Sequence, residues 1–345
     1  MYLHGCNYPW STDGTTIFYG LDFGANVWGS HLGVSTRRRA VARDLADMAA
    51  LGFTVVRWFV FGDGRAGIVY DDRGLPVGPD GYLFADLDAA LDGAREAGVR
   101  VDFVLLDHRW LFSGLAATLA DPITGLTYEA QLPEGRAGVL LSAAGRDGLF
   151  EGVIQPMVRR YGPSGARADL GPAVFGYEFM NEPDFVVEEW ERDLSPRVRR
   201  PLRFDLLATL VSRLSTLVHD EHPAALTTIG CARLHNLWAW DDDALGLDVL
   251  QVHSYPASEG AEPGADVLHT PRAALGVRRP VIIGECPASR IADYLEFAVE
   301  AGYAGAWPWS FSGTDAHGRV PEAPLREFAA RHPALVNPTC RARRS

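Results

Sequence analysis

The sequence predicts a closed barrel of eight parallel strands, each followed by a helix: a (β/α)8, or TIM, barrel. Its 345 residues are enough for such a barrel. Strand-like and helix-like segments alternate along the chain, which is typical of a parallel sheet. The connections that leave the strands are long, whereas those that enter them are only a few residues. In a barrel this asymmetry gathers the long loops on one face, where ligand chemistry takes place.

The predicted strands are short runs rich in β-branched and aromatic residues. Most are continuously apolar, as expected of strands that are covered on both faces. In chain order they span residues 3–8, 54–61, 100–106, 174–180, 226–230, 249–253, 281–284 and 305–309.

The predicted helices are amphipathic segments between these strands. Two of them end at Gly52 and Gly98, immediately before a strand, as helix C-termini commonly do. Only short helical candidates follow the fifth and sixth strands, at 239–245 and 270–275. The longer ones span 36–51, 85–97, 147–161, 202–219, 289–301 and 321–330.

We expect a single domain over residues 1–345. It carries an insertion at 11–35, after the first strand, and a long loop at 108–146, after the third. Both segments are expected to shape the ligand-binding face, and either could block one end of it.

Composition narrows the function classes. Acidic residues outnumber basic ones by 44 to 32, a formal net charge of −12, which disfavours nucleic acid and membrane surfaces as partners. Every basic residue is arginine, so mechanisms that need a catalytic lysine, such as Schiff-base and P-loop chemistry, are excluded. No segment approaches the roughly 18 apolar residues that a membrane span needs.

The N-terminus shows no basic region followed by an apolar one. We therefore expect a cytoplasmic protein, or a secreted one if the chain has been trimmed. We also expect a monomer or weak homo-oligomer. The cysteines lie far apart without a Cys-x-x-Cys pair, which favours reduced thiols over a zinc site or a disulfide framework. They are Cys6, Cys231, Cys286 and Cys340.

Two predicted strands end abruptly in a carboxylate. The fourth runs through apolar residues to Asn181, Glu182 and Pro183, and the seventh ends at Glu285. A carboxylate at the end of a buried strand is costly unless it is paired, protonated or used. Alone, either glutamate has a structural interpretation, as a helix cap or an arginine partner. Together over one opening, they suit general-acid and nucleophile roles.

Other strand ends carry side chains that suit a sugar. Charged and polar groups hydrogen-bond to hydroxyls, and aromatic faces pack on C–H surfaces. Singly, each also has a structural interpretation, such as core packing or an internal ion pair. Of two neighbouring tryptophans, Trp309 is preferred over Trp307 as the floor of the site. With Asn181, the candidate substrate-binding residues are Arg57, His108, His253, Tyr255, Trp307 and Trp309.

These motifs, in this order along nearly the whole chain, resemble those of the clan A glycoside hydrolases, specifically the family-five cellulase and β-mannanase type. The segments 57–64 and 309–313 look more like the mannanase type. The motifs that carry the resemblance are Arg57, Asp107-His108, Asn181-Glu182-Pro183, His253-Ser254-Tyr255, Glu285 and the tryptophan of the eighth strand.

The resemblance implies a retaining hydrolase of β-linked oligosaccharide or polysaccharide that needs no metal or other cofactor. Glu182 would be the acid/base, Glu285 the nucleophile, and Asn181 a donor to the sugar 2-hydroxyl. His253 and Tyr255 would tune the two carboxylates, with Tyr255 donating to Glu285. A retaining enzyme places its carboxyl groups about 5–5.5 Å apart, against roughly 6.5–9.5 Å for an inverting one.

Alternatives remain open at this point. The acids could hold a divalent metal for an isomerase or lyase on the same barrel, or the barrel could bind carbohydrate without catalysis. Glu178 lies four residues before Glu182, on the same face of the strand but deeper, and is interpreted as a structural acid paired with Arg57. Trp190, Trp238 and Trp240 either line outer sugar sites or pack in the core.

The glycine pattern at 62–67 matches the dinucleotide-binding fingerprint. The residues after it, 68–74, predict a hairpin or loop rather than the helix that this motif requires, so we reject the match.

Overall fold

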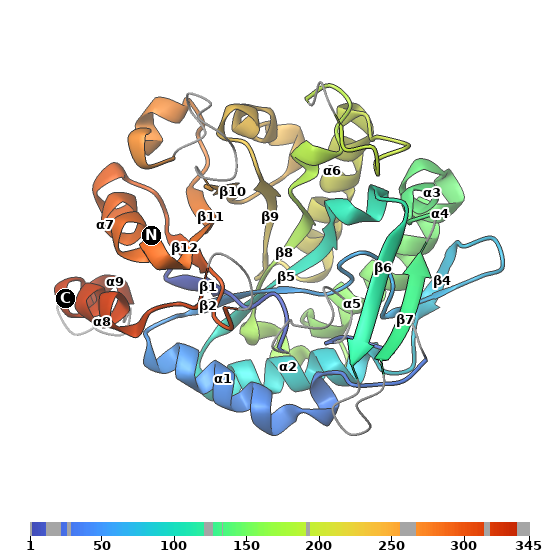
Figure 1. Cartoon of the computed structure of the whole chain (residues 1–345), viewed down its shortest axis with the longest axis horizontal. Helices are drawn as coiled ribbons and strands as arrows, with labels where there is room; N and C mark the ends of the chain where they lie inside the picture. Colours follow the sequence, from blue (N-terminus) through green and yellow to red (C-terminus); the bar gives the residue numbers. More distant parts are fainter. Residues whose placement is uncertain are drawn as a thin grey trace.

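The computed structural model describes residues 2–11, 22–25, 29–120, 127–132, 134–190, 194–255, 267–313 and 318–336. Eight parallel strands form one sheet in strictly sequential order around a barrel (Figure 1). They are β1 (Gly5–Asn7), β2 (Val55–Phe59), β5 (Arg100–Asp107), β8 (Val174–Asn181), β9 (Leu226–Cys231), β10 (Leu250–His253), β11 (Val281–Pro287) and β12 (Ala306–Trp309).

Backbone hydrogen bonds between the two ends of the chain close the barrel. The N–H of Leu3 donates to the carbonyl of Ala304 at 2.7 Å, and the N–H of Phe311 donates to that of Asn7 at 2.9 Å. The first and last strands therefore lie side by side. The predicted (β/α)8 barrel is confirmed, and each of the eight predicted strands is present.

Helices surround the strands, with α1 and α2 along one side and α6 and α7 on others (Figure 1). In α6 the apolar residues Leu207, Leu210, Leu214 and Val218 recur every three or four positions and are buried against the barrel. The main helices are α1 (Arg38–Ala50), α2 (Leu83–Ala97), α4 (Ala143–Leu149), α5 (Gln155–Tyr161), α6 (Phe204–Glu221), α7 (Ile291–Ala301) and α8 (Glu322–Arg331). Two short ones are α3 (Ala137–Leu141) and α9 (Pro333–Val336).

The helical layer is thin after β9 and β10, as the sequence predicts. Among the residues described there, which exclude 256–266, the helical elements are 3-10 turns, namely η6 (Leu234–Trp240), η7 (Asp243–Leu245), η8 (Val267–His269) and η9 (Arg272–Leu275). No helix in the described part of the chain is both long and apolar enough to cross a membrane.

Two hairpins extend from the loops. The first, β3 (Ile68–Tyr70) with β4 (Pro76–Pro79), confirms that a hairpin rather than a helix follows the glycine pattern at 62–67. The second, β6 (Leu115–Ala120) with β7 (Thr127–Leu132), lies in the long loop after β5 and is not predicted by the sequence analysis.

The described parts of the insertion after β1 pack on the outer side of the barrel. The Asp22 carboxylate accepts hydrogen bonds at 2.7 Å from the indole of Trp58 and from the guanidinium of Arg37. Because side chains alternate along β2, Trp58 points away from the interior that Arg57 occupies. Residues 22–25 therefore lie on the outer side of β2. Residues 12–21 and 26–28 are outside the described residues, so the expectation that 11–35 shapes the ligand-binding face stays a prediction.

The cysteines that the structure describes, Cys6, Cys231 and Cys286, are buried free thiols. Burial raises the pKa of each thiol well above its usual value, which keeps it protonated and unreactive. The expectation of reduced thiols is confirmed for these three; Cys340 lies outside the described residues.

Candidate active site

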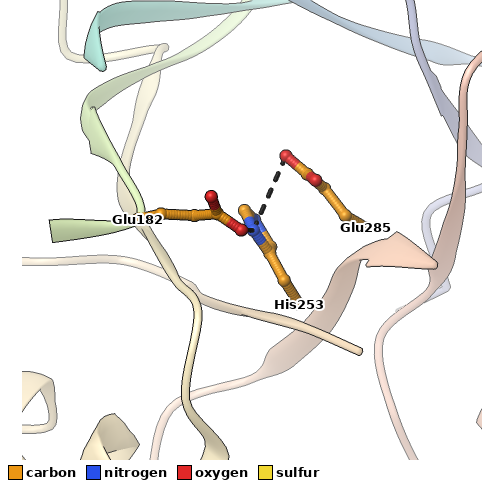
Figure 2. A group of neighbouring side chains, drawn as sticks. All are labelled: Glu182, His253 and Glu285. Carbon is orange, nitrogen blue, oxygen red and sulfur yellow. Dashed lines mark hydrogen bonds and ion pairs between the residues drawn. The ribbon is translucent and has the colours of Figure 1, made fainter. Parts of the chain in front are cut away.

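The two predicted catalytic glutamates face each other at the C-terminal ends of the strands. Glu182 directly follows β8, and Glu285 lies in β11. One carboxylate oxygen of each, together with a ring nitrogen of His253, all lie within 4.8 Å of one another. Figure 2 shows His253 between the two carboxylates, with Nδ1 3.0 Å from Oε1 of Glu182 and 3.5 Å from Oε1 of Glu285. Barrel closure thus joins two residues separated by 103 positions, 182 and 285.

Glu285 sits among hydrogen-bond donors. Arg57 donates through Nη1 to its Oε1 at 2.6 Å, and the Tyr255 hydroxyl donates to its Oε2 at 2.9 Å. Burial raises the pKa of Glu285, while the charge of Arg57 and its hydrogen bond act in the opposite direction. The donors stabilise the carboxylate form, which is the form that a nucleophile needs. The contact predicted between Tyr255 and Glu285 is present.

Glu182 is more exposed than Glu285 and, among the described residues, has fewer hydrogen-bond donors around its carboxylate. Its side chain is 17% exposed, against 5% for Glu285. Burial is the main cause that raises the pKa of Glu182 to about 7; the charge of His108 opposes it, and that of Asp107 adds to it. A carboxyl group with a pKa near neutrality can both donate and accept a proton, as an acid/base requires.

Arg57 lies beneath the glutamates rather than beside a ligand. Its side chain has no exposed surface, and it binds both oxygens of Glu178 at 2.7 Å through Nε and Nη2. It also donates to Asn7 at 2.9 Å and to Asn181 at 2.7 Å. The predicted pairing of Glu178 with Arg57 is confirmed. The prediction that Arg57 contacts the substrate is corrected, because its buried side chain instead holds Glu285 and Asn181 in place.

His253 is corrected in the same sense. Its imidazole has no exposed surface, so it contacts the two glutamates and not a ligand. Burial lowers the pKa of His253 to about 4, which keeps the ring neutral. A neutral ring between two carboxyl groups fits the tuning role that the family resemblance implies.

Asn181 and His108 lie beside Glu182 on the barrel opening. Asn181 donates through Nδ2 to Asp107 at 2.8 Å, which leaves its second amide hydrogen available. His108 Nδ1 lies 3.5 Å from Asp107 and 3.8 Å from Oε2 of Glu182. The His108 side chain is 12% exposed, so it can reach a ligand at the opening.

Aromatic rings cluster on the opposite side of the opening. Trp309, 9% exposed, packs edge-on against Trp10 at 5.9 Å and against Phe59 at 6.0 Å between ring centroids. Tyr255 belongs to the same cluster. This arrangement supports Trp309 as the aromatic floor of a sugar site.

Trp307 lies elsewhere, and its assignment to the substrate site is corrected. It is fully buried, its indole donates to the carbonyl of Leu3 at 3.0 Å, and it packs with Phe175 at the N-terminal end of the barrel. Trp307 and Trp309 both point inward because they are two residues apart on β12. The indole of Trp307, however, is one layer deeper.

The outer tryptophans separate in a similar way. Trp190 and Trp240 pack edge-on at 5.5 Å and both contact Phe204, so they are packing residues. Trp238 is 70% exposed on η6, after β9.

Several polar residues of the site were missed by sequence reasoning. Asn7 joins three strands, since it accepts from Arg57 and donates to the carbonyl of Gly284 at 2.8 Å. Gln251 donates to Asp102 at 3.1 Å and to Glu178 at 3.0 Å, deeper in the barrel. Burial, followed by the charge of Glu178, raises the pKa of Asp102 to about 8. Isolated polar residues inside apolar strands were the available signal.

Gly230 on β9 makes room for this network. A Cβ atom at this position would lie 2.5 Å from Oε1 of Glu178 and 3.1 Å from Nε2 of His253. Any larger residue would therefore displace the groups that support the glutamates.

A divalent metal has the right donor atoms here, because Glu182, His253 and Glu285 each offer one. The electrostatics disfavour it. The Arg57 guanidinium is 2.6 Å from Glu285 and fully buried, so a fixed positive charge already occupies one side of that carboxylate.

A closed barrel with glutamates at the ends of its fourth and seventh strands is the arrangement of the clan A glycoside hydrolases that the sequence motifs resemble. No family model matches the chain. The mannan endo-1,4-β-mannosidase of Mytilus edulis is 22% identical over 350 residues, which cover 90% of this chain and 83% of that protein.

Solved structures agree with this relationship. The β-mannanase of Mytilus edulis superimposes with a TM-score of 0.72 at 19% identity, over 95% of this chain and 90% of the other. The β-1,4-D-mannanase of Cryptopygus antarcticus gives 0.73 at 18% identity, over 96% and 90%. A GH5_18 protein of Streptomyces cattleya gives 0.56 at 19% identity, over 90% and 80%. These comparisons establish the barrel fold and confirm the resemblance to family-five glycoside hydrolases.

Proposed function

We propose that this protein is a retaining glycoside hydrolase that cleaves β-linked mannan or manno-oligosaccharides with Glu285 as nucleophile and Glu182 as acid/base. The observation that carries the proposal is the position of the two carboxylates, which approach within 4.8 Å around His253. An inverting pair stands roughly 6.5–9.5 Å apart to admit a water molecule, so the shorter gap supports direct attack.

In the first step, Glu285 attacks the anomeric carbon while Glu182 gives its proton to the departing glycosidic oxygen. Arg57 and Tyr255 keep Glu285 ionised through the contacts at 2.6 and 2.9 Å. Glu182, whose pKa burial raises to about 7, holds a proton at neutral pH or below.

In the second step, Glu182 accepts a proton from water, and the water attacks the glycosyl-enzyme to release the sugar with its original β configuration. The remaining amide hydrogen of Asn181 serves the sugar 2-hydroxyl, and Trp309 supports the ring face. Preference for mannose over glucose rests on the named activity of the similar proteins and on the mannanase-like segments 57–64 and 309–313.

The test is hydrolysis of aryl β-mannosides, aryl β-glucosides and the corresponding β-1,4-oligosaccharides by the wild type, Glu285→Gln and Glu182→Ala. We expect activity on the mannosides, loss of several orders of magnitude in Glu285→Gln, and retained configuration by NMR. With azide, Glu182→Ala should form a β-glycosyl azide, because a small anion needs no general base.

Glu322→Gln is the matched control, since Glu322 is an exposed glutamate on α8 and should be neutral. The metal-dependent alternative requires that a chelator abolish activity. The carbohydrate-binding alternative requires two results: the wild type hydrolyses none of these substrates, and Glu285→Gln binds manno-oligosaccharide as tightly as the wild type. Either result would overturn the proposal.

A further inference from the structure

The turn that carries Glu182 has an unusual backbone. Among the described residues, Glu182 is the one non-glycine residue with positive φ, at φ 49° and ψ 51°. A non-glycine side chain in this left-handed region is sterically strained, so the surroundings must hold it there. On the entering side, the N–H of Glu182 donates to the carbonyl of Gly230 at 2.7 Å.

On the leaving side, Asp184 anchors the turn to the neighbouring strand. It lies in the 3-10 turn η5 (Pro183–Phe185), and its fully buried carboxylate accepts from the N–H of Ala232 at 2.7 Å and from Nδ2 of Asn236 at 2.7 Å. The Cys231 thiol donates to it at 3.4 Å. All three donors belong to the end of β9 and to η6.

This carboxylate is costly for a purely structural contact. None of the ion pairs formed within the described ranges involves Asp184, and burial raises its pKa. A buried carboxylate without a countercharge is energetically unfavourable, and apolar packing would often stabilise such a position as well or better. A requirement at the neighbouring functional group explains why an acid stands there.

We propose that Asp184 is a positioning residue for the acid/base: its carboxylate clamps the turn after β8 to β9 and η6 and thereby aims Glu182 at Glu285. The inference rests on the proposed function. Phe185 extends the clamp, because its ring contacts His108 edge-on at 5.2 Å and lies 5.1 Å from the Arg233 guanidinium.

The clamp also has an electrostatic consequence. The titratable groups that face Glu182 come from six elements. The charges of Asp107 and Asp184 raise its pKa, and those of His108 and Arg57 lower it. The neutral ring of His253 lies 3.0 Å away, and a carboxylate oxygen of Glu285 lies within 4.8 Å. Removal of the charge at position 184 therefore lowers the pKa of Glu182.

The first test is Asp184→Asn, measured as kcat and KM against pH on a manno-oligosaccharide. A misplacement of about 1 Å costs roughly 100-fold in rate, so we expect kcat to fall 10- to 100-fold with KM nearly unchanged. The alkaline limb of the profile should move to lower pH. Asp205→Asn is the control, because Asp205 is an exposed aspartate paired with Arg203 and should change neither quantity.

The second test is the double variant Asp184→Asn/Asn236→Asp, which reverses the direction of the hydrogen bond between the two positions. The amide at 184 then donates to the carboxylate at 236, and its carbonyl still accepts from Ala232. We expect kcat to recover at least 10-fold over the single variant, the signature of a direct pair. Equal kcat in wild type and a folded Asp184→Asn, or no recovery in a folded double variant, would overturn the clamp.

Two measurements keep the inference testable if Asp184→Asn does not fold or the wild type is inactive. Asn236→Ala removes one donor but keeps the charge, so kcat should fall without movement of the alkaline limb. Carboxyl ¹³C NMR, assigned through Glu182→Gln, reports the Glu182 titration without any turnover. An inactive wild type overturns the proposed function alone; an unchanged Glu182 titration in a folded Asp184→Asn overturns the electrostatic part of this inference.

Discussion

Nη1 of Arg57 binds Oε1 of Glu285 at 2.6 Å in the closed interior of the barrel. Glu182 has no such partner among the described residues: its near neighbours are imidazole rings, at 3.0 Å from His253 and 3.8 Å from His108. Of the two glutamates of the site, Glu285 is thus the one paired with a buried cation within the described residues. The roles proposed for the two glutamates rest on this asymmetry, and the predictions below follow from it.

The dependence of kcat/KM on pH should be bell-shaped. Glu182 must be protonated in the first step, and its pKa is raised to about 7, so kcat/KM should fall as pH rises through about 7. Glu285 must be ionised, so kcat/KM should also fall as pH drops through its pKa. A profile of kcat/KM on an aryl mannoside measures both limbs. A rate that keeps rising well above pH 8 would contradict the assignment of Glu182 as the acid.

Tyr255→Phe should weaken the nucleophile. The lost hydrogen bond at 2.9 Å stabilises the Glu285 carboxylate, so its removal raises the pKa of Glu285 and moves the acidic limb to higher pH. A hydrogen bond to a charged group contributes about 1.5–3 kcal/mol, equivalent to roughly 10- to 100-fold in kcat/KM. An acidic limb that does not move would show that the hydroxyl serves another purpose.

Arg57→Met should destabilise the fold as well as the site. It leaves the buried Glu178 carboxylate without its bidentate partner, and such a loss costs about 3–5 kcal/mol in the free energy of unfolding. Urea denaturation measures this change. The control is Arg326→Ala, which breaks an exposed pair with Glu322 on α8 and should change the unfolding free energy by less than about 1 kcal/mol.

Trp307 and Trp309 should respond differently to truncation. Trp307→Ala empties a fully buried position and should cost about 3–5 kcal/mol of stability. Trp309→Ala should act mainly on KM for oligosaccharides, because Trp309 lies at the opening. Denaturation curves and kinetics on both variants separate these effects, and a Trp307→Ala variant that is stable but binds substrate poorly would reverse the correction made above.

His4 should make the fold sensitive to acid. It is fully buried between Phe53 and Phe328, with ring centroids 4.7 and 5.6 Å away, and burial lowers its pKa to about 4. Between its ordinary value of about 6.5 and about 4, the unfolded chain binds a proton that the folded protein does not. The unfolding free energy should therefore fall by up to about 3 kcal/mol over that range as pH drops.

The variant His4→Leu should lack this part of the pH slope in urea denaturation. His235→Gln, at an exposed histidine on η6, is the control and should keep it. An identical slope in His4→Leu and wild type would show that other groups cause the acid sensitivity.

The strands and the two glutamates were predictable because both follow from local sequence. Apolar runs with abrupt polar ends mark buried parallel strands, and closure of the barrel brings strand ends together whatever their separation in the chain. The same rule applied to β1 would have found Asn7 and Trp10, which lie at and just beyond its end.

The depth of each side chain was not predictable in this way. Alternation along a strand shows that Arg57, Trp307 and Trp309 point inward, but not which layer of the barrel each occupies. That depends on the stagger between neighbouring strands, which is a property of the closed sheet. The sequence pattern therefore predicts Arg57 and Trp307 as ligand contacts, although both side chains are fully buried in the structure. The β6–β7 hairpin was not predictable for a different reason: its two strands lie within a long loop, and the sequence of β6 does not alternate strongly between apolar and polar residues.

The seam between β1 and β12 has a consequence for how the chain reaches its native state. Leu3 and Asn7 find their partners at Ala304 and Phe311, some 300 positions later. During synthesis, the edge of β1 that pairs with β12 has no hydrogen-bond partner until almost the whole polypeptide has emerged from the ribosome. Contacts between such distant positions raise the contact order, which slows folding. A nascent or truncated chain that lacks β12 would present that open strand to other molecules, which makes premature termination a route to aggregation.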